Sequence, residues 1–215
     1  MDETTLREIL KSHEEWLSGK GGKPADLRGA ALRGTDLRGA RLCVASLHEA
    51  NLRGADLREA VLSGADLHEA DLHEANLREA NLFEANLCGA DLHGVDLRGA
   101  DLSRARLRGA ELSNADLRGA NLRDAVLSGA DLREADLRRA SLHGTILVLA
   151  GLYKADLRDA CLVGADLHGA NLRNADLRGA IMCKEDLFNA KLYEANLFRG
   201  CLVYPLLTYR RRTDR

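Results

Sequence analysis

The sequence has no long hydrophobic run, and several familiar site motifs are absent from it. None of its apolar stretches is long enough to cross a membrane, and the first residues carry too much charge for a secretory signal. Its 5 cysteines, without such a signal, predict a reducing, cytoplasmic location. There is no Gly-rich phosphate loop and no pair of cysteines with metal-site spacing. We therefore expect neither a membrane protein nor a nucleotide-binding or zinc-binding domain.

A strict five-residue period fills most of the chain instead. Leu or Met occupies every fifth position from Leu27 to Leu202, thirty-six times without a slip. Ala usually lies two residues before it and Asp or Asn one before, while Arg, His or Ser and then Gly or Glu follow; residues 65–84 read ADLHE ADLHE ANLRE ANLFE. Such an uninterrupted short period predicts a repeat solenoid.

The spacing of the apolar residues favours an extended backbone. Ala and Leu are two positions apart, so both point to the same face of an extended segment, and the remaining two residues turn a corner. An α-helix needs apolar spacings of three and four, and a period of five would spread its apolar stripe around the cylinder.

The motif A(D/N)LXX resembles that of the pentapeptide repeat family over residues 25–204. The resemblance implies an all-β fold, a right-handed quadrilateral parallel β-helix with four pentapeptides per coil and about nine coils in this chain. Residues 1–24 are expected to form an N-terminal capping helix and a link, with the helix at 5–18 and Thr4 or Thr5 as its N-cap. Residues 205–215 are expected to be a C-terminal cap or a basic tail.

A period of twenty is visible in the outward positions. Stepping by twenty through the residue after the central Leu gives an unbroken series of eight arginines, each preceded by Asp or Asn two residues earlier: Arg38, Arg58, Arg78, Arg98, Arg118, Arg138, Arg158 and Arg178. We expect a column of Arg beside a column of carboxylates, with lateral ion pairs. The column is either a solvated surface or a binding site for an anionic polymer, and the adjacent carboxylates oppose the second reading.

The last repeats differ in composition from the others. Of the Phe and Tyr residues only Phe83 precedes residue 150, and Glu185 stands where an inward Ala is expected. An apolar girdle of this kind predicts a contact surface for a partner protein or a second copy, although residues 204–209 are an alternative cover for the end. The candidate interaction residues are Phe188, Tyr193, Phe198, Val203, Tyr204 and Leu206.

Two pairs of histidines, His48 with His68 and His73 with His93, are expected to stack between neighbouring coils. They are either a divalent metal site or solvated substitutes for Arg, and the second interpretation is favoured. The inward positions carry almost only Leu and Ala, so we expect no catalytic site, no bound metal and no cofactor.

Function is predicted less sharply than fold. Family members that act on DNA gyrase mimic duplex DNA with an acidic rod and protect the enzyme from quinolones. Here Asp occupies fifteen of the thirty-six positions before Leu, but Arg residues nearly neutralise them, and the net charge is −2. We therefore expect a non-enzymatic scaffold or protein-interaction rod with an unknown protein partner, a homodimer through its C-terminal end, and no direct binding of nucleic acid. The alternative is a DNA mimic that binds gyrase.

Overall fold

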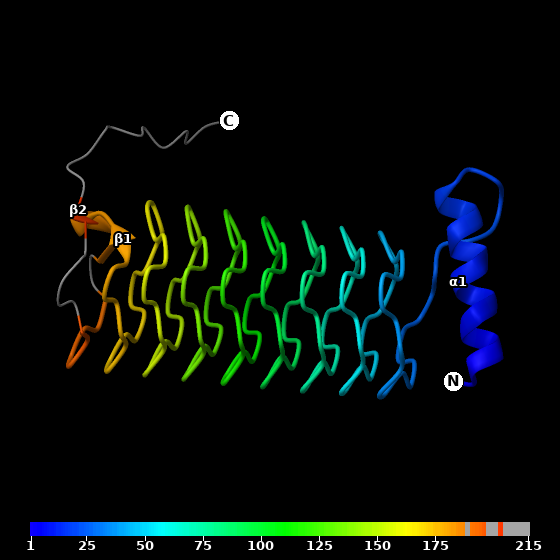
Figure 1. The fold of residues 1–215 in the computed structure, drawn as a ribbon, viewed down its shortest axis with the longest axis horizontal. Coiled ribbons are helices and arrows are strands. Elements are labelled where there is room, and N and C mark those ends of the chain that lie inside the picture. The colour runs from blue at the N-terminus through cyan, green and yellow to red at the C-terminus, as the bar shows by residue number, and fades with distance from the viewer. Residues whose placement is uncertain (188–189, 197–201, 204–215) are drawn as a thin grey trace.

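The chain winds into a straight rod, described here from a computed structural model for residues 1–187, 190–196 and 202–203. Helix α1 (Glu3–Leu17) lies across the N-terminal end (Figure 1). Near the other end are strand β1 (Ile181–Met182), the 3-10 helix η1 (Lys184–Leu187) and strand β2 (Leu202–Val203). No helix among the described residues is long and apolar enough to cross a membrane.

Parallel pairing between residues twenty apart holds successive coils together. The residue before the central Leu forms an isolated parallel bridge with its counterpart in the next coil, from Asp26 with Ser46 to Asp176 with Asn196. Strands β1 and β2 are also parallel, but Ile181 pairs with Leu202 and Met182 with Val203, so the register there is shifted by one residue from the step of twenty. A step of twenty residues corresponds to four pentapeptides per turn, which confirms the predicted period. The predicted total of nine coils extends into residues 197–201, outside the described part of the chain.

The core is a filled axis of Leu and Ala. Every central Leu from Leu27 to Leu177, together with Met182, is at most 2% exposed. Burial of one Leu contributes about 1.5–3 kcal/mol, but a single coil leaves its core open on both faces. The inward Thr145 is also buried, and its hydroxyl donates a hydrogen bond to the Leu122 carbonyl at 2.8 Å.

The Asp or Asn before the central Leu has a backbone role that was not foreseen. Between neighbouring coils the backbone ladder leaves one N–H per repeat without a backbone partner, that of the residue after Leu. The side chain of Asp or Asn accepts this bond: the N–H groups of His68 and Phe83 lie 3.2 and 3.0 Å from Asp66 Oδ1 and Asn81 Oδ1. Because an unpaired N–H is costly in a packed structure, this contact explains the preference for Asp and Asn.

Each corner is a tight turn with a left-handed residue. The N–H three residues after the central Leu donates to that Leu's carbonyl, as in Ala30 to Leu27 at 3.1 Å, and the residue two after Leu has φ near +60°. A positive φ at that position is typical of a type II turn and favours Gly. Among the residues that the structure describes, seventeen other than Gly also adopt it, including the β-branched Val44 at φ 59°.

Helix α1 starts earlier than expected. The prediction that Thr4 or Thr5 is the N-cap of a helix at 5–18 was wrong, because Asp2 is the N-cap and its side chain accepts the Thr5 N–H at 2.9 Å. A carboxylate at this position also interacts favourably with the positive end of the helix dipole.

The helix covers the first coil through specific polar contacts. The buried His13 accepts the Ala25 N–H on Nδ1 at 3.0 Å, and burial lowers the pKa of this imidazole. The Met1 ammonium donates to the Ala31 carbonyl at 3.3 Å, and Arg41 pairs with Glu14 at 2.6 Å. These contacts occupy part of the open β edge of the first coil.

The regular winding breaks at residue 184. Glu185, expected at an inward position, is exposed on η1, because an ionised carboxylate inside the Leu core would lose its hydration without a partner. Asp186 then supplies a side-chain acceptor, since Ile181 has none: its Oδ2 accepts the N–H groups of Cys183 at 2.7 Å and Gly164 at 3.3 Å. Burial raises the pKa of Asp186.

The strain at the corners gives a stability test. Left-handed φ costs a β-branched residue about 1–2 kcal/mol relative to Gly, so Val44→Gly should raise the melting temperature by a few degrees. The reverse change, Gly54→Val, should lower it, although a Cβ at Gly54 meets open space. Thermal unfolding followed by circular dichroism measures both, and a lower melting temperature for Val44→Gly would contradict the assignment.

Candidate interaction surfaces

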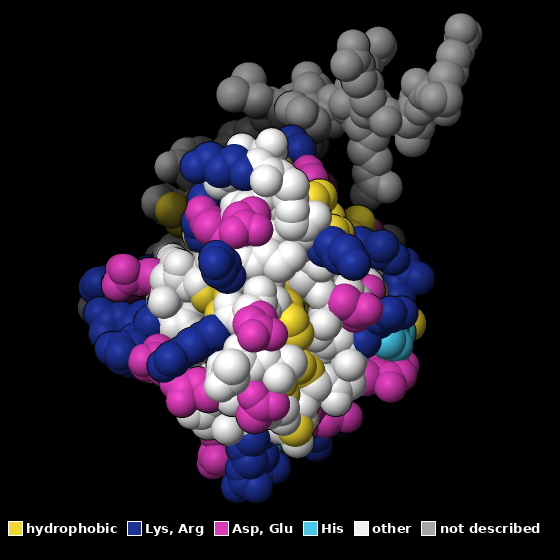
Figure 2. All heavy atoms as spheres, turned by 90° about the vertical axis from the view of Figure 1, so that its right-hand side faces the viewer, with side chains coloured by type: hydrophobic (Ala, Val, Ile, Leu, Met, Phe, Trp, Pro, Cys, Tyr) yellow, Lys and Arg dark blue, Asp and Glu magenta, His cyan; other side chains and the backbone are white. Residues whose placement is uncertain are grey.

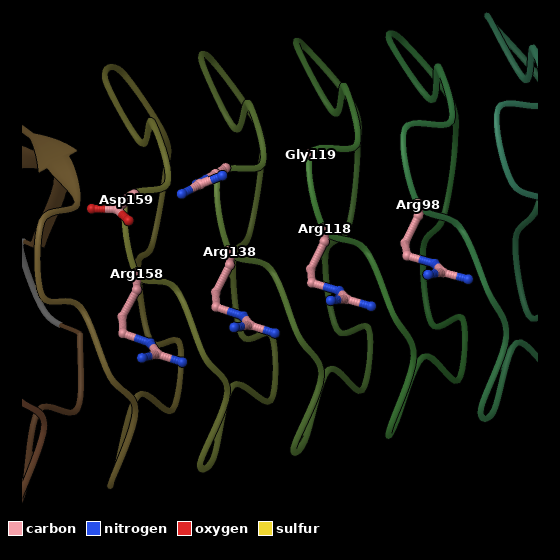
Figure 3. Close-up of a pocket in the computed structure, with 7 residues that line it drawn as sticks. Arg98, Arg118, Gly119, Arg138, Arg158 and Asp159 are labelled. Atoms are coloured by element: carbon pink, nitrogen blue, oxygen red, sulfur yellow. The ribbon is translucent and has the colours of Figure 1, made fainter.

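One side of the rod carries the predicted column of arginines. Figure 3 shows Arg98, Arg118, Arg138 and Arg158 extended in parallel from successive coils. Each of these arginines donates two hydrogen bonds to the carboxylate of the Asp two residues earlier. In Arg118, Nε lies 2.8 Å from Asp116 Oδ1 and Nη2 lies 2.6 Å from Asp116 Oδ2. We call this column of Arg and Asp the charged ladder.

The ladder is also linked between coils. Arg118 Nε lies 3.5 Å from Asp136 Oδ2 in the next coil, and Arg138 Nε lies at the same distance from Asp156 Oδ2. A carboxylate inside the ladder therefore lies between two guanidinium groups. Arg78 is an exception, because Asn76 replaces its Asp and its Nε lies 3.5 Å from Glu79 instead.

The ion pairs hold the ladder close to neutral. Hydrogen bonds from Arg38 lower the pKa of Asp36 to about 2, and Arg98 likewise lowers the pKa of Asp96. An open depression of about 560 Å³ lies along the ladder, where Gly119 leaves the corner without a side chain. An anionic ligand there would compete with carboxylates already bound to each guanidinium, which weakens it as a polyanion site.

A second surface is apolar. It lies nearer the C-terminal end of the rod and covers parts of two adjacent sides. On one side Ile146 and Leu149 are 39% and 68% exposed. The half-buried Val126 and Val148 flank them, and Val126 is paired directly with Ile146. Around the corner, which contains Gly144, the adjacent side presents further half-buried apolar groups. We call the whole surface the apolar patch: Val126, Ile146, Val148, Leu149, Cys161, Val163, Ile181 and Cys183.

The predicted C-terminal girdle is described only in part. Tyr193 is 65% exposed, and the Arg173 guanidinium lies 5.6 Å from its ring centre, a cation–π contact. Val203 belongs to β2 and is paired with Met182. The remaining girdle residues, and therefore the predicted dimer contact, lie outside the described residues: Phe188, Phe198, Tyr204 and Leu206.

The histidines stack as expected. Ring centres lie 5.2 Å apart for His48 and His68 and 5.0 Å apart for His73 and His93, with nearly parallel planes. His68 Nδ1 lies 2.6 Å from the Cys88 carbonyl, and His48 Nε2 lies 3.1 Å from Glu49. Within the described part of the chain, no group of three or more His, Cys, Asp or Glu is arranged to hold a metal ion.

Comparison with known proteins agrees with this geometry. The sequence model of pentapeptide repeats matches eight copies along the chain, over residues 25–64, 45–82, 80–124, 110–147, 150–184 and 165–201. The chain belongs to the pentapeptide repeat family. As a member it folds as a right-handed β-helix. No curated protein sequence matches it.

Solved structures of pentapeptide repeat proteins are similar to the chain. HetL, which is involved in heterocyst differentiation regulation in the cyanobacterium Nostoc sp. strain PCC 7120, is 38% identical; the match covers 86% of this chain and 92% of HetL, with a TM-score of 0.39. A trypsin-treated variant of QnrB1, a plasmid-mediated fluoroquinolone resistance protein, is 17% identical over 83% of this chain and 86% of that chain, with a TM-score of 0.63. At that identity the second match shows the shared fold alone.

The ladder predicts a loss of stability in acid. The pKa values of ladder carboxylates such as Asp36 and Asp96 lie below those of the unfolded chain, which are near 3.9, so the unfolded chain takes up protons first as the pH falls. The ladder's contribution should be complete above about pH 5 and disappear towards pH 2. Urea midpoints across this range measure it. Asp96→Asn should flatten the pH dependence and Asn76→Asp should steepen it; identical profiles for the two variants would contradict the assignment.

Proposed function

We propose that this pentapeptide repeat protein is a non-enzymatic scaffold that binds a partner protein through the apolar patch. The observation that carries the proposal is the exposure of Ile146 and Leu149 on a rod whose charged ladder pairs its own charges. Contiguous exposed apolar groups on a soluble surface usually mark a contact site. The interior supports the non-enzymatic part, because Leu and Ala fill it.

The partner would meet a rigid surface that spans two adjacent sides of the rod. Adjacent coils hold the patch residues in fixed register, as in the bridges of Val126 with Ile146 and Cys161 with Ile181. A rigid surface loses little conformational entropy when it binds, so a small patch of large side chains can dominate the affinity. The exposed Tyr193 lies further towards the C-terminal end and extends the same proposal to the girdle, where we also place a homodimer contact.

The patch is tested by charge substitution. The double variant Ile146→Glu/Leu149→Glu should reduce recovery of the partner at least about tenfold in quantitative affinity purification, which corresponds to about 1.4 kcal/mol. The matched control is Val44→Glu, which changes a similarly exposed apolar residue (61%) in the first coil and should leave recovery unchanged. Proteins captured equally by all three forms would count against the patch.

The second candidate is gyrase binding by mimicry of DNA, and the fold shared with QnrB1 is what keeps it open. Mimicry needs a strip of negative charge to replace phosphates, whereas here Arg118 and its neighbours neutralise the Asp column. We expect no inhibition of gyrase supercoiling, and no protection against a fluoroquinolone, at low micromolar protein. Inhibition or protection would establish the mimic and replace the scaffold as the proposed function.

A further inference from the structure

The first coil has no preceding coil to pair with, and its side from Asp36 to Arg38 adjoins the end of helix α1. In the second coil, three backbone groups on this side bond to the preceding coil: Asp56 N–H to the Thr35 carbonyl, and the carbonyls of Asp56 and Arg58 to N–H groups, at 2.8–3.0 Å. The equivalent groups of the first coil are the Asp36 N–H and the carbonyls of Asp36 and Arg38. Among the described residues, none has a hydrogen-bond partner.

Helix α1 covers other parts of the first coil. The polar contacts of α1 go to Ala25 and Arg41, and that of Met1 goes to Ala31; none goes to the segment from Asp36 to Arg38. The inward Thr35 and Ala40 beside that segment are only half-buried, whereas the equivalent Ala55 in the next coil is fully buried. The core is therefore incompletely closed along this side.

A cavity of about 320 Å³ lies between the helix and this side. Its lining is apolar in part, with Met1, Leu6 and Leu10 from the N-terminal segment and Leu32 from the first coil. It also includes Thr35 and the charged residues Asp2, Glu3, Arg7 and Asp36. Figure 2 looks onto this end of the rod and shows hydrophobic side chains visible among charged ones. The cavity is large enough for one Leu-sized side chain, which in every later coil is supplied by the coil before it.

The charged ladder is also incomplete at this end. The Asp36 side chain is 58% exposed, against 29% for Asp56, because no guanidinium from an earlier coil lies over it. Within the ladder that position is filled, as where Arg38 Nε lies 3.7 Å from Asp56 Oδ2. Asp36 is paired with its own Arg38 at 2.6 Å, but it lacks the second guanidinium and is exposed directly beside the open backbone groups.

We propose that this end binds an extended peptide from a partner protein, which adds as one more parallel strand along Asp36–Arg38. The peptide pairs with the three open backbone groups. It places a Leu-like side chain in the cavity and the Arg that follows it against Asp36. A small residue two positions before the Leu passes the corner at Thr35. The surface thus selects the pattern Ala-x-Leu-Arg by hydrogen bonds, shape and charge together.

This inference rests on the proposed function in that it gives a protein-binding rod a second docking surface with a defined ligand. The two are separable, because the apolar patch lies several coils away. The double variant Ile146→Glu/Leu149→Glu should therefore bind the peptide as the original chain does. Failure of the peptide to bind would leave the patch proposal standing, and loss of the patch contact would leave this one standing.

The test is a titration of the 15N-labelled full chain with the capped peptide Gly-Ala-Asp-Leu-Arg-Gly, followed by NMR. We expect saturable shifts at the amides of Asp36, Arg38 and Leu6. Replacing the peptide's Leu by Asp should weaken binding at least about tenfold, and replacing its Arg by Asp about fivefold. Shifts that do not saturate, or that do not centre on Asp36, would overturn the proposal.

A charge exchange identifies the contact. Asp36→Arg should weaken the original peptide about fivefold, and the peptide with Asp in place of Arg should recover that loss. The matched control is Asp26→Arg, since Asp26 is also 58% exposed and paired with its own Arg28, but lies on a side without the cavity. An equal effect of both substitutions would refute the assignment. If Asp36→Arg did not fold, the charge-reversed peptide on the original chain would report the same contact.

Discussion

Hydrogen bonding between residues twenty apart is the constraint on which this protein depends. No coil satisfies its own backbone. Each exchanges hydrogen bonds in both directions with the coils before and after it, and the Asp or Asn ahead of the central Leu takes the one N–H that remains, as Asp66 does for His68. A helix completes most of its bonds internally, whereas a β-helix transfers the unsatisfied groups to its two ends. The ends must therefore be closed by something other than another coil, such as α1 at the first.

The repeat of twenty residues also determines the arrangement of the surface. Side chains twenty residues apart lie directly over one another, so a chemical choice made once is repeated along a whole side. Arg and Asp alternate in the ladder and cancel, which keeps a long column of like charges from repelling itself. Recognition then falls to the places where the repetition fails: the large apolar side chains at Ile146 and Leu149, and the uncovered segment at Asp36.

Prediction from sequence succeeded where periodicity holds and failed where it ends. The five-residue spacing from Leu27 onward was enough to predict the core, and the step of twenty was enough to predict the Arg column and the stacking of His48 on His68. The N-cap at Asp2 and the break at Glu185 were missed, because both depend on local competition for hydrogen bonds. The backbone role of Asp and Asn was missed too, since its signal resembles that of surface charge.

The strict register at the corners also limits how the gene for such a chain can change length. Removal of a single pentapeptide would rotate everything beyond it by a quarter turn, so that the arginines after Arg98 would move to the neighbouring side and lose alignment with those before it. Removal or duplication of twenty residues would leave every side in line. Lineages of this protein should therefore differ in length by sixty nucleotides at a time, and recombination between coils becomes the natural route by which the rod grows or shortens.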